Sequence, residues 1–329
     1  MALLFVIDLM EETVLKRKRS FFRRFLGFII IVGMIVGGIG YLVTDYIHGK
    51  MNYSGISSVS SEPLKEAGVI NVLLIGNDSR DAGQDGRSDA MILLSISNET
   101  KTIHLTSLLR DMYVDIPEHK GNRLNAAYAY GGPELLMETI EENFDIEVNR
   151  YVQVNFQAFA HLVDAVGGVE LEVTNEEVKY INAYLVEYNM LEGNEVGTDY
   201  LDETLSGRIH LNGPQALAYC RNRYLGTDFG RTERQRKILS AVIQNAPKVL
   251  LNDPLGIIND ILPMLTTNLT QSEIGKLFLQ VPNFLIYDIV QGSLPVEGSY
   301  SNVSIRGMSV LEVNFEKNNE YIRENIYGK

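Results

Sequence analysis

The stretch from Asn71 to Asp111, NVLLIGNDSRDAGQDGRSDAMILLSISNETKTIHLTSLLRD, contains three patterned segments separated by polar turns. Val72–Ile75 is a short apolar run that ends at a Gly-Asn-Asp sequence, and Ala90–Ile96 is a second apolar run beyond a loop rich in Gly and Asp. Lys101–Leu105 alternates between polar and apolar residues. Short apolar runs between turn residues are typical of buried strands, and alternation is typical of a strand with two unlike faces. The stretch therefore predicts neighbouring strands of one β-sheet.

Two carboxylates lie at the predicted ends of these strands. Asp78 follows the first strand and Asp89 begins the second, so pairing of the strands would bring both to one rim of the sheet. Two carboxylates together with substrate phosphate oxygens and water suit Mg²⁺ or Mn²⁺. Arg80, Arg87 and Arg110 lie at the same strand ends and would place cations beside the metal. Taken singly, each aspartate is also typical of a turn or a cap.

A second informative stretch is Leu217–Leu239, LAYCRNRYLGTDFGRTERQRKIL, which holds five arginines and a lysine in a chain of formal net charge −13. Arg221 and Arg223 are two residues apart and share a face if the backbone is extended. Arg231 and Gln235 are four residues apart and share a face of a helix. Rows of planar donors suit a cluster of anionic oxygens such as a diphosphate. The alternative is a solvated basic surface.

Periodicity along the rest of the chain indicates alternating helices and strands. Leu136, Ile140 and Phe144 recur at four-residue steps after Pro133, as on one face of a helix. We therefore expect an α/β domain in which a mixed central β-sheet is flanked by helices. The expected strands are Tyr151–Asn155 and Val169–Val173, and the expected helices are Pro133–Phe144, Phe156–Val166, Pro214–Tyr219, Gln235–Asn245 (ending near Pro247) and Ser272–Gln280.

The N-terminal region predicts a membrane anchor. Phe25–Val43 is a run of 19 residues without a charge, long enough to cross a bilayer, and six cations precede it. The positive-inside bias makes residues 1–24 a short cytoplasmic segment, 25–43 a single transmembrane helix, 44–69 an extracytoplasmic linker and 70–329 an extracytoplasmic domain at the cell membrane. A cleaved signal peptide is the alternative, but the run exceeds the usual length and no A-x-A-like site follows.

Six motifs carry a resemblance to a known family. They are NVLLIGNDSR, RSDAMILLSI, LTSLLRDMYVDIP, NRLNAAYAYGG, LNGPQALAYCRNRY and DFGRTERQRKIL, and together they cover about residues 71–240. In this order they resemble the LytR–CpsA–Psr family of membrane-anchored phosphotransferases of Gram-positive bacteria. The resemblance implies an extracytoplasmic α/β/α domain that moves a teichoic acid or capsule-like glycopolymer from an undecaprenyl-diphosphate carrier onto peptidoglycan, with release of undecaprenyl phosphate.

The resemblance also implies roles for individual residues. The family's metal-binding aspartates match Asp78 and Asp89, and Arg123 stands where the family often has Lys, which changes the hydrogen-bond geometry. We expect Arg110, Asp89 and Arg87 to act in catalysis, with Asp89 or Asp111 as base unless a loose transition state needs none. An apolar pocket for the polyprenyl chain would be lined by residues such as Leu136, Ile140, Phe159 and Leu162. The expected diphosphate-binding residues are Arg80, Arg87, Arg110, Arg123, Arg221, Arg223, Arg231 and Gln235.

The alternative function is a polyprenyl-diphosphate binder or a cell-envelope regulator without turnover, because the same arginines serve binding alone. The presence of both Asp78 and Asp89 favours turnover. Nucleic acid is not an expected partner, since the cations of residues 1–24 are explained by membrane orientation. Cys220 lies in a motif without histidine, so we expect a buried side chain there and not a catalytic thiol.

Overall fold

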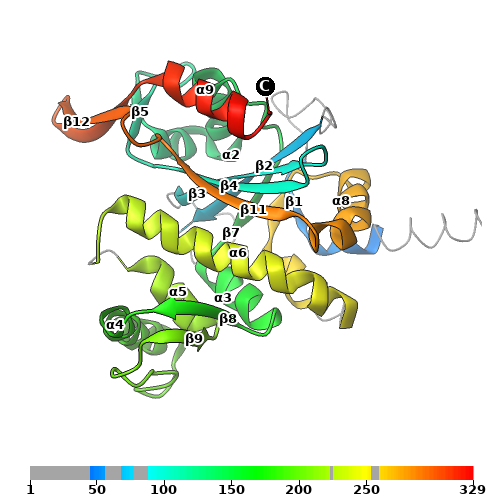
Figure 1. The fold of residues 1–329 in the computed structure, drawn as a ribbon, viewed down its shortest axis with the longest axis vertical. Helices are drawn as coiled ribbons and strands as arrows, with labels where there is room; N and C mark the ends of the chain where they lie inside the picture. The colour runs from blue at the N-terminus through cyan, green and yellow to red at the C-terminus, as the bar shows by residue number, and fades with distance from the viewer. Residues whose placement is uncertain (1–44, 56–67, 78–87, 223–224, 253–258, 329) are drawn as a thin grey trace, which may run out of the picture.

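The computed structural model describes residues 45–55, 68–77, 88–222, 225–252 and 259–328 (Figure 1). The predictions for residues 1–43 and for Asp78, Arg80, Arg87 and Arg223 lie outside this part of the chain, as does the side chain of Asp89. Within the described part, no helix has both the length and the apolar composition that a bilayer crossing needs.

A seven-stranded mixed sheet forms the centre of the fold, as predicted. Its order is β1-β10-β7-β2-β3-β4-β11. Strands β2, β3 and β4 are antiparallel neighbours, whereas β7 pairs with β2 and β11 pairs with β4 in parallel. The strands are β1 (Asn52–Tyr53), β2 (Val69–Asn77), β3 (Ser88–Ser97), β4 (Thr102–Leu108), β7 (Tyr151–Val154), β10 (Thr266–Thr267) and β11 (Asp288–Leu294).

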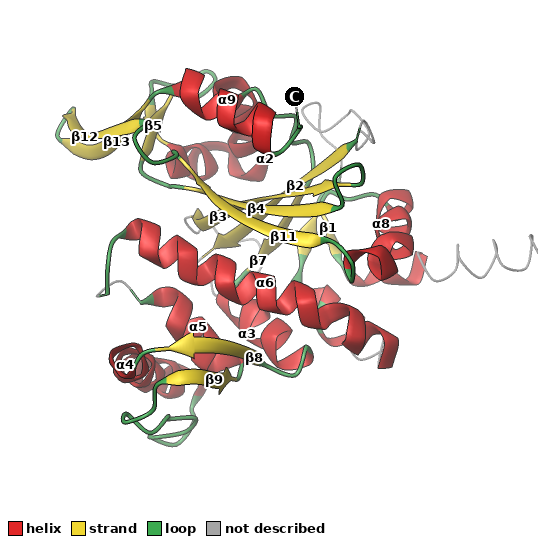
Figure 2. Ribbon diagram, viewed as in Figure 1, coloured by secondary structure: helices red, strands yellow, loops and turns green. Residues whose placement is uncertain are grey.

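Helices cover both faces of this sheet (Figure 2). On one face, α2 (Leu124–Phe144) and α9 (Phe315–Asn325) enclose the largest apolar core with β2 and β3. On the other face, α6 (Asp228–Asn252) runs beneath the sheet, and Leu239 and Ile243 pack on Ile92, Ile103 and Leu105. Beyond α6 lie α3 (Phe156–Ala165), α4 (Asn175–Glu192), α5 (Gly213–Arg221) and the pair β8 (Val169–Val173) and β9 (Gly207–Leu211).

A small four-stranded sheet lies at one end of the central sheet, above the N-terminus of α6 (Figure 1). Its order is β12-β13-β5-β6, and Tyr300 on β12 stacks on Phe229 at the start of α6, with ring centroids 5.2 Å apart. The strands are β5 (Met112–Val114), β6 (Asn122–Arg123), β12 (Tyr300–Ile305) and β13 (Met308–Val313).

Three of the expected local structures need correction. The helix expected to end near Pro247 begins at Asp228 and continues to Asn252, because Ala246 and Val249 on either side of the proline still pack against the core around β8. Arg221 is the last residue of α5 and not part of an extended segment. The helix expected from Pro133 is the second part of α2, which is interrupted at Gly131 and Gly132.

Part of the segment expected to be a linker joins the folded domain. Residues 45–50 are helical, and Ile47 is buried against Leu269 and Ile274. Strand β1 then pairs with β10 at the edge of the central sheet. The helix α8 (Gln271–Phe284), which was expected at Ser272–Gln280, covers this edge.

A buried ion pair fastens α8 to the sheet. Arg150, just before β7, is 1% exposed, and its Nε and Nη2 atoms each lie 2.8 Å from an oxygen of Glu273. Glu273 also accepts a hydrogen bond from the backbone N–H of Thr270, the N-cap residue of α8. A bidentate pair with both partners buried holds the two elements in one register.

We expect Arg150→Met or Glu273→Leu alone to lower the free energy of unfolding by about 3–5 kcal/mol, because each leaves a buried charge without its partner. The double variant should be more stable than either single variant. Urea unfolding measures all three. Glu233→Gln, which breaks an exposed pair with Lys237 on α6, is the matched control and should cost less than about 1 kcal/mol. Strictly additive losses would contradict this account of the pair.

Candidate functional site

A cavity of about 670 Å³ lies between the central sheet and helices α3, α4, α5 and α6. Its walls are largely apolar side chains that come from several elements at once. Such a cavity suits a hydrocarbon chain, because apolar surface is removed from water on both sides of the contact. Lining side chains include Leu74 and Ile92 of the sheet, Val152 of β7, Phe159 and Leu162 of α3, Tyr180 and Tyr184 of α4, and Leu239 and Val242 of α6.

The expected lining of this cavity is half right. Phe159 and Leu162 line it, as predicted. Leu136 and Ile140 do not, because α2 packs on the opposite face of the sheet, where both side chains are fully buried in the main core. Four-residue spacing identified a buried face of α2 correctly but carries no information on which face of the sheet that helix covers.

One end of the cavity is polar. On α6 the lining residues are Arg231, Gln235, Leu239 and Val242, which follow one another on a single helical face. These residues span about 16 Å of helix at 1.5 Å per residue, and they change from polar to apolar away from the N-terminus of α6. The cavity therefore has a cationic, hydrogen-bonding end, called its mouth below, and an apolar remainder. The predicted placement of Arg231 and Gln235 on one helical face is confirmed.

Arg221 reaches the same cavity from the end of α5. Its guanidinium carbon lies 4.5 Å from the ring centroid of Phe156 and 5.5 Å from that of Tyr184. The hydroxyl of Tyr184 donates a hydrogen bond to the backbone carbonyl of Arg221 at 2.5 Å. Stacking on two rings holds the planar cation in place before any ligand binds.

Two carboxylates connect three further arginines into a network. Asp111 lies 3.4 Å from Nε of Arg110 and 3.3 Å from Nη1 of Arg123. Asp228, in the first turn of α6, lies 3.0 Å from Nη2 of Arg231 and 3.7 Å from Nη2 of Arg110. The five groups carry a net charge of +1, three cations against two anions, so the network retains an attraction for a further anion.

The structure brings together every predicted diphosphate-binding residue that it describes. Arg231 belongs both to the network and to the cavity mouth, where it meets Arg221 and Gln235. The buried Oε1 atom of Gln235 has no hydrogen-bond partner within the described residues. Arg80, Arg87 and Arg223 remain predictions, since they lie outside this part of the chain.

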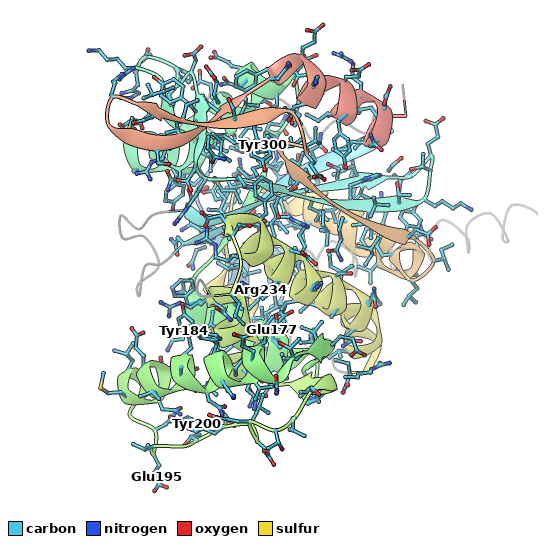
Figure 3. All side chains as sticks on the ribbon, turned by 60° about the vertical axis from the view of Figure 1, so that its left-hand side comes forward. Glu177, Tyr184, Glu195, Tyr200, Arg234 and Tyr300 are labelled. Carbon is cyan, nitrogen blue, oxygen red and sulfur yellow. The ribbon has the colours of Figure 1, made fainter. Side chains whose placement is uncertain are left out.

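The other two arginines of the basic stretch are structural. Arg234 donates to the backbone carbonyls of Asn222 and Leu225, both at 2.8 Å, and lies 3.8 Å from Glu177 of α4. Figure 3 shows Arg234, Glu177 and Tyr184 gathered between α6 and α4. Arg236 points to the opposite side and donates to the hydroxyl of Ser107 at 2.7 Å.

Sequence reasoning missed Asp228, Phe156 and Tyr184. An acidic residue in the first turn of a helix is a recognised signal, and Asp228 precedes Arg231 by three residues, the spacing of a helical ion pair. Tyr180 and Tyr184 repeat at four-residue spacing on one face of α4, and both line the cavity. No local signal marks Phe156, because its role depends on where α5 ends.

The rim expected to hold a metal is only partly described. Strands β2 and β3 pair through Gly76 with Ala90 and through Asn77 with Ser88, and Asp89 lies in β3 between Ser88 and Ala90. Asp78, which follows Asn77 in the sequence, lies outside the described residues. The buried Oδ1 atom of Asn77 has no hydrogen-bond partner among the described residues. An oxygen acceptor beside two carboxylate positions fits a hard cation such as Mg²⁺. Elsewhere in the described ranges, no group of three or more His, Cys, Asp or Glu side chains has the arrangement of a metal site.

Cys220 is buried in the wall of the cavity, and burial raises the pKa of its thiol above the ordinary value. A thiol that stays protonated is a poor nucleophile, so this side chain serves packing, as expected.

Comparison with known proteins gives consistent relatives. The model of the LytR_cpsA_psr family matches residues 44–325. A protein of Enterococcus faecalis named polyisoprenyl-teichoic acid–peptidoglycan teichoic acid transferase TagU is 33% identical over 264 residues, which are 78% of this chain and 80% of that protein. A solved structure of TagT bound to LI-WTA matches with a TM-score of 0.64 at 25% identity and covers 84% of this chain and 99% of its own. The crystal structure of B. subtilis TagT matches with a TM-score of 0.61 at 26% identity, over the same shares of the two chains.

Proposed function

Because this chain belongs to the LytR–CpsA–Psr family, we propose that it is a phosphotransferase of cell-wall biogenesis. It moves an anionic glycopolymer from an undecaprenyl-diphosphate carrier onto peptidoglycan and releases undecaprenyl phosphate. The observation that carries the proposal is the apolar cavity with arginines at its mouth. The apolar part suits the prenyl chain of a lipid diphosphate, and the arginines suit its diphosphate. The activity in the name of the TagU relative, transfer of a polyisoprenyl-linked teichoic acid to peptidoglycan, supports the same conclusion.

Binding of the donor follows from the two ends of the cavity. The prenyl chain lies among the side chains of β2, β3, α3 and α6, where each buried methylene contributes about 0.8 kcal/mol. The diphosphate lies at Arg221 and Arg231, which are fixed by aromatic rings and by Asp228 respectively. Because these side chains are already held in place, they lose little conformational freedom when the anion binds, and more of the interaction free energy appears as affinity.

The reaction exchanges the phosphoanhydride bond of the diphosphate for a phosphate ester bond. A hydroxyl oxygen of a peptidoglycan sugar attacks the phosphorus that carries the polymer, and the bond from that phosphorus to the bridging oxygen breaks. The electron pair of the broken bond stays on undecaprenyl phosphate, and the hydroxyl proton passes to a base or to solvent. Arg110, held between Asp111 and Asp228, meets the charge that develops on the phosphate oxygens.

Asp111 acts through the arginines it holds. Each of its two carboxylate oxygens lies beside an N–H group, of Arg110 or of Arg123, so it positions both side chains against the substrate. We assign the role of base, where one is used, to Asp89. Arg123 donates hydrogen bonds to the phosphate oxygens through the guanidinium N–H groups that do not face Asp111.

The proposal includes a divalent cation, Mg²⁺ or Mn²⁺, held by Asp78 and Asp89. When bound, such an ion would neutralise charge on the diphosphate oxygens. The Oδ1 atom of Asn77, for which the described residues provide no hydrogen-bond partner, lies at the same rim and supports this assignment.

The proposal also includes a single-pass anchor formed by residues 25–43, with residues 1–24 in the cytoplasm and the catalytic domain outside the cell. The charge-free run and the preceding cations support it. The described fold begins two residues after this run, where residues 45–50 pack against α8.

The second candidate function is a lipid-diphosphate binder or regulator without turnover. The network of Arg110, Arg123 and Arg231 is held in place by Asp111 and Asp228, and such an arrangement serves binding as well as catalysis. The two candidates differ in one observable, the appearance of polymer on peptidoglycan.

The transfer assay uses purified ectodomain, Mg²⁺, a lipid-diphosphate-linked donor and peptidoglycan fragments. We expect Arg110→Ala to lower single-turnover transfer by about 10²–10³ with a smaller loss of donor affinity, because this side chain meets charge that forms only during the reaction. Arg221→Ala should weaken donor binding and transfer together.

Arg208→Ala is the matched control, because this exposed arginine pairs with Glu170 on the β8–β9 pair and should transfer like wild type. A loss of affinity by Arg110→Ala in full proportion to its loss of rate would refute the differential role. Donor binding by wild type without any transfer would establish the binder.

Asp78→Ala and Asp89→Ala should each abolish most transfer, and the double variant should be little worse than either one, since residues that hold one ion act as a unit. Asp260→Ala, an exposed aspartate outside the site, is the control. Undiminished transfer by either single variant, or by wild type in excess chelator, would remove the cation from the proposal.

A further inference from the structure

A pair of stacked aromatic rings lies on the surface beside the arginine network. The rings of His119 and Tyr130 have centroids 4.7 Å apart and planes inclined by 28°. Tyr130 is 49% exposed, and His119 is exposed as well. Tyr128, two residues earlier on α2, is buried in the main core, whereas Tyr130 lies on the side of the helix that faces away from this core.

Hydrogen bonds tie this pair to the network. The side-chain amide of Asn122 donates to the Tyr130 hydroxyl at 2.7 Å, and its carbonyl oxygen accepts from the backbone N–H of Arg123 at 2.8 Å. The guanidinium of Arg123 then pairs with Asp111. A continuous set of contacts therefore leads from the exposed rings to the arginines assigned to the diphosphate.

The backbone of α2 fixes the position of Tyr130. The helix is interrupted at Gly131 and Gly132, immediately after this residue, and Gly132 has a φ of +67°. A Cβ atom at Gly131 would lie 2.6 Å from the Cβ atom of Leu135, so a side chain there would displace the turn that holds the ring. The aromatic pair is thus held by a local conformation that requires glycine.

A third ring and a further arginine belong to the same small sheet and its β12–β13 turn. Tyr113 on β5 is paired with Arg123 on β6, and its hydroxyl accepts a hydrogen bond from Arg306 at 2.8 Å. Gly121 lies against the Tyr113 ring, where a Cβ atom would be 3.0 Å from the hydroxyl oxygen. The surface around β5, β6 and the start of α2 therefore combines aromatic faces with amide, hydroxyl and guanidinium groups.

This combination matches the chemistry of a sugar. The C–H bonds on one face of a pyranose ring meet the electron-rich face of an aromatic ring, and its hydroxyl groups hydrogen-bond with side chains at the ring's edge. An apolar ligand would make no use of the polar groups at the edges of the rings, and a bare anion would make no use of the rings. The reaction requires a sugar close to the diphosphate, either the polymer sugar attached to it or the acceptor sugar.

We propose that His119 and Tyr130, with Asn122, form a binding platform for a pyranose ring of the glycan that reacts at the neighbouring arginines. The ring stacks on the exposed face of Tyr130, and Asn122 fixes the orientation of that face relative to Arg123. The platform rests on the proposed function for the identity of its ligand, and it deepens that function by assigning a sugar subsite.

Equilibrium binding of three ligands to the ectodomain tests the platform. They are farnesyl diphosphate, which has no sugar, the same lipid diphosphate carrying a disaccharide, and a soluble peptidoglycan glycan fragment. We expect Tyr130→Leu and His119→Leu to bind farnesyl diphosphate within twofold of wild type. Each should bind at least one of the sugar ligands about three- to tenfold more weakly, the contribution typical of an aromatic contact. Loss with the lipid-linked disaccharide places the donor sugar on the platform, and loss with the fragment alone places the acceptor there.

Tyr130→Phe keeps the ring and removes only the hydroxyl, so it should retain most of the affinity that Tyr130→Leu loses. Tyr200 has a similar exposure (37%) and lies in the loop after α4. Figure 3 shows it far from Tyr300, which belongs to the same small sheet as Asn122. Tyr200→Leu should therefore bind all three ligands like wild type. Unchanged affinity of both leucine variants for both sugar ligands would overturn the platform, and so would equal losses in Tyr130→Phe and Tyr130→Leu. Failure of wild type to bind farnesyl diphosphate would count against the proposed function instead, and the glycan fragment would still report on the platform.

Discussion

The orientation of α6 is the constraint on which the site depends. Two buried arginines on this helix find their partners on different neighbours, Arg234 at the carbonyls that follow α5 and Arg236 at Ser107 of the central sheet. Rotation or translation of α6 would separate at least one buried cation from its acceptors, which costs several kcal/mol. With the helix fixed in this way, Gln235, Leu239 and Val242 necessarily face the cavity.

The same arginines divide structure from function by the kind of acceptor they meet. The hydrogen bonds of Arg234 and Arg236 go to neutral oxygens in the interior, although Arg234 also lies 3.8 Å from Glu177, and burial lowers the pKa of Arg236 from its ordinary value. Arg110, Arg123 and Arg231 meet carboxylates in the network that begins at the polar end of the cavity, and the side chain of Asp228 is 43% exposed. An arriving diphosphate can therefore share or replace a carboxylate contact without leaving a cation unpaired.

Local pattern predicted the elements of this fold well, and it predicted their mutual arrangement less well. Apolar runs located β2 and β3, alternation located β7, and the four-residue spacing of Arg231 and Gln235 placed both on one helical face. The same spacing could not assign Leu136 and Ile140 to a face of the sheet, because that depends on the path of the chain between elements. Phe156 and Tyr184 contribute by stacking on Arg221, and Asp228 contributes by its contact with Arg110. Both arginines are distant from these partners in sequence, so local pattern could not predict the contacts.

The central claim is that one cavity binds a lipid diphosphate with its chain among the side chains of β2, β3, α3 and α6 and its diphosphate at the arginines. A crystal structure of the ectodomain with farnesyl diphosphate measures this directly. The account predicts the prenyl chain between Leu74, Phe159 and Leu239, with phosphate oxygens within hydrogen-bonding distance of Arg221 and Arg231. A diphosphate bound away from both arginines, or a prenyl chain outside the cavity, would contradict it.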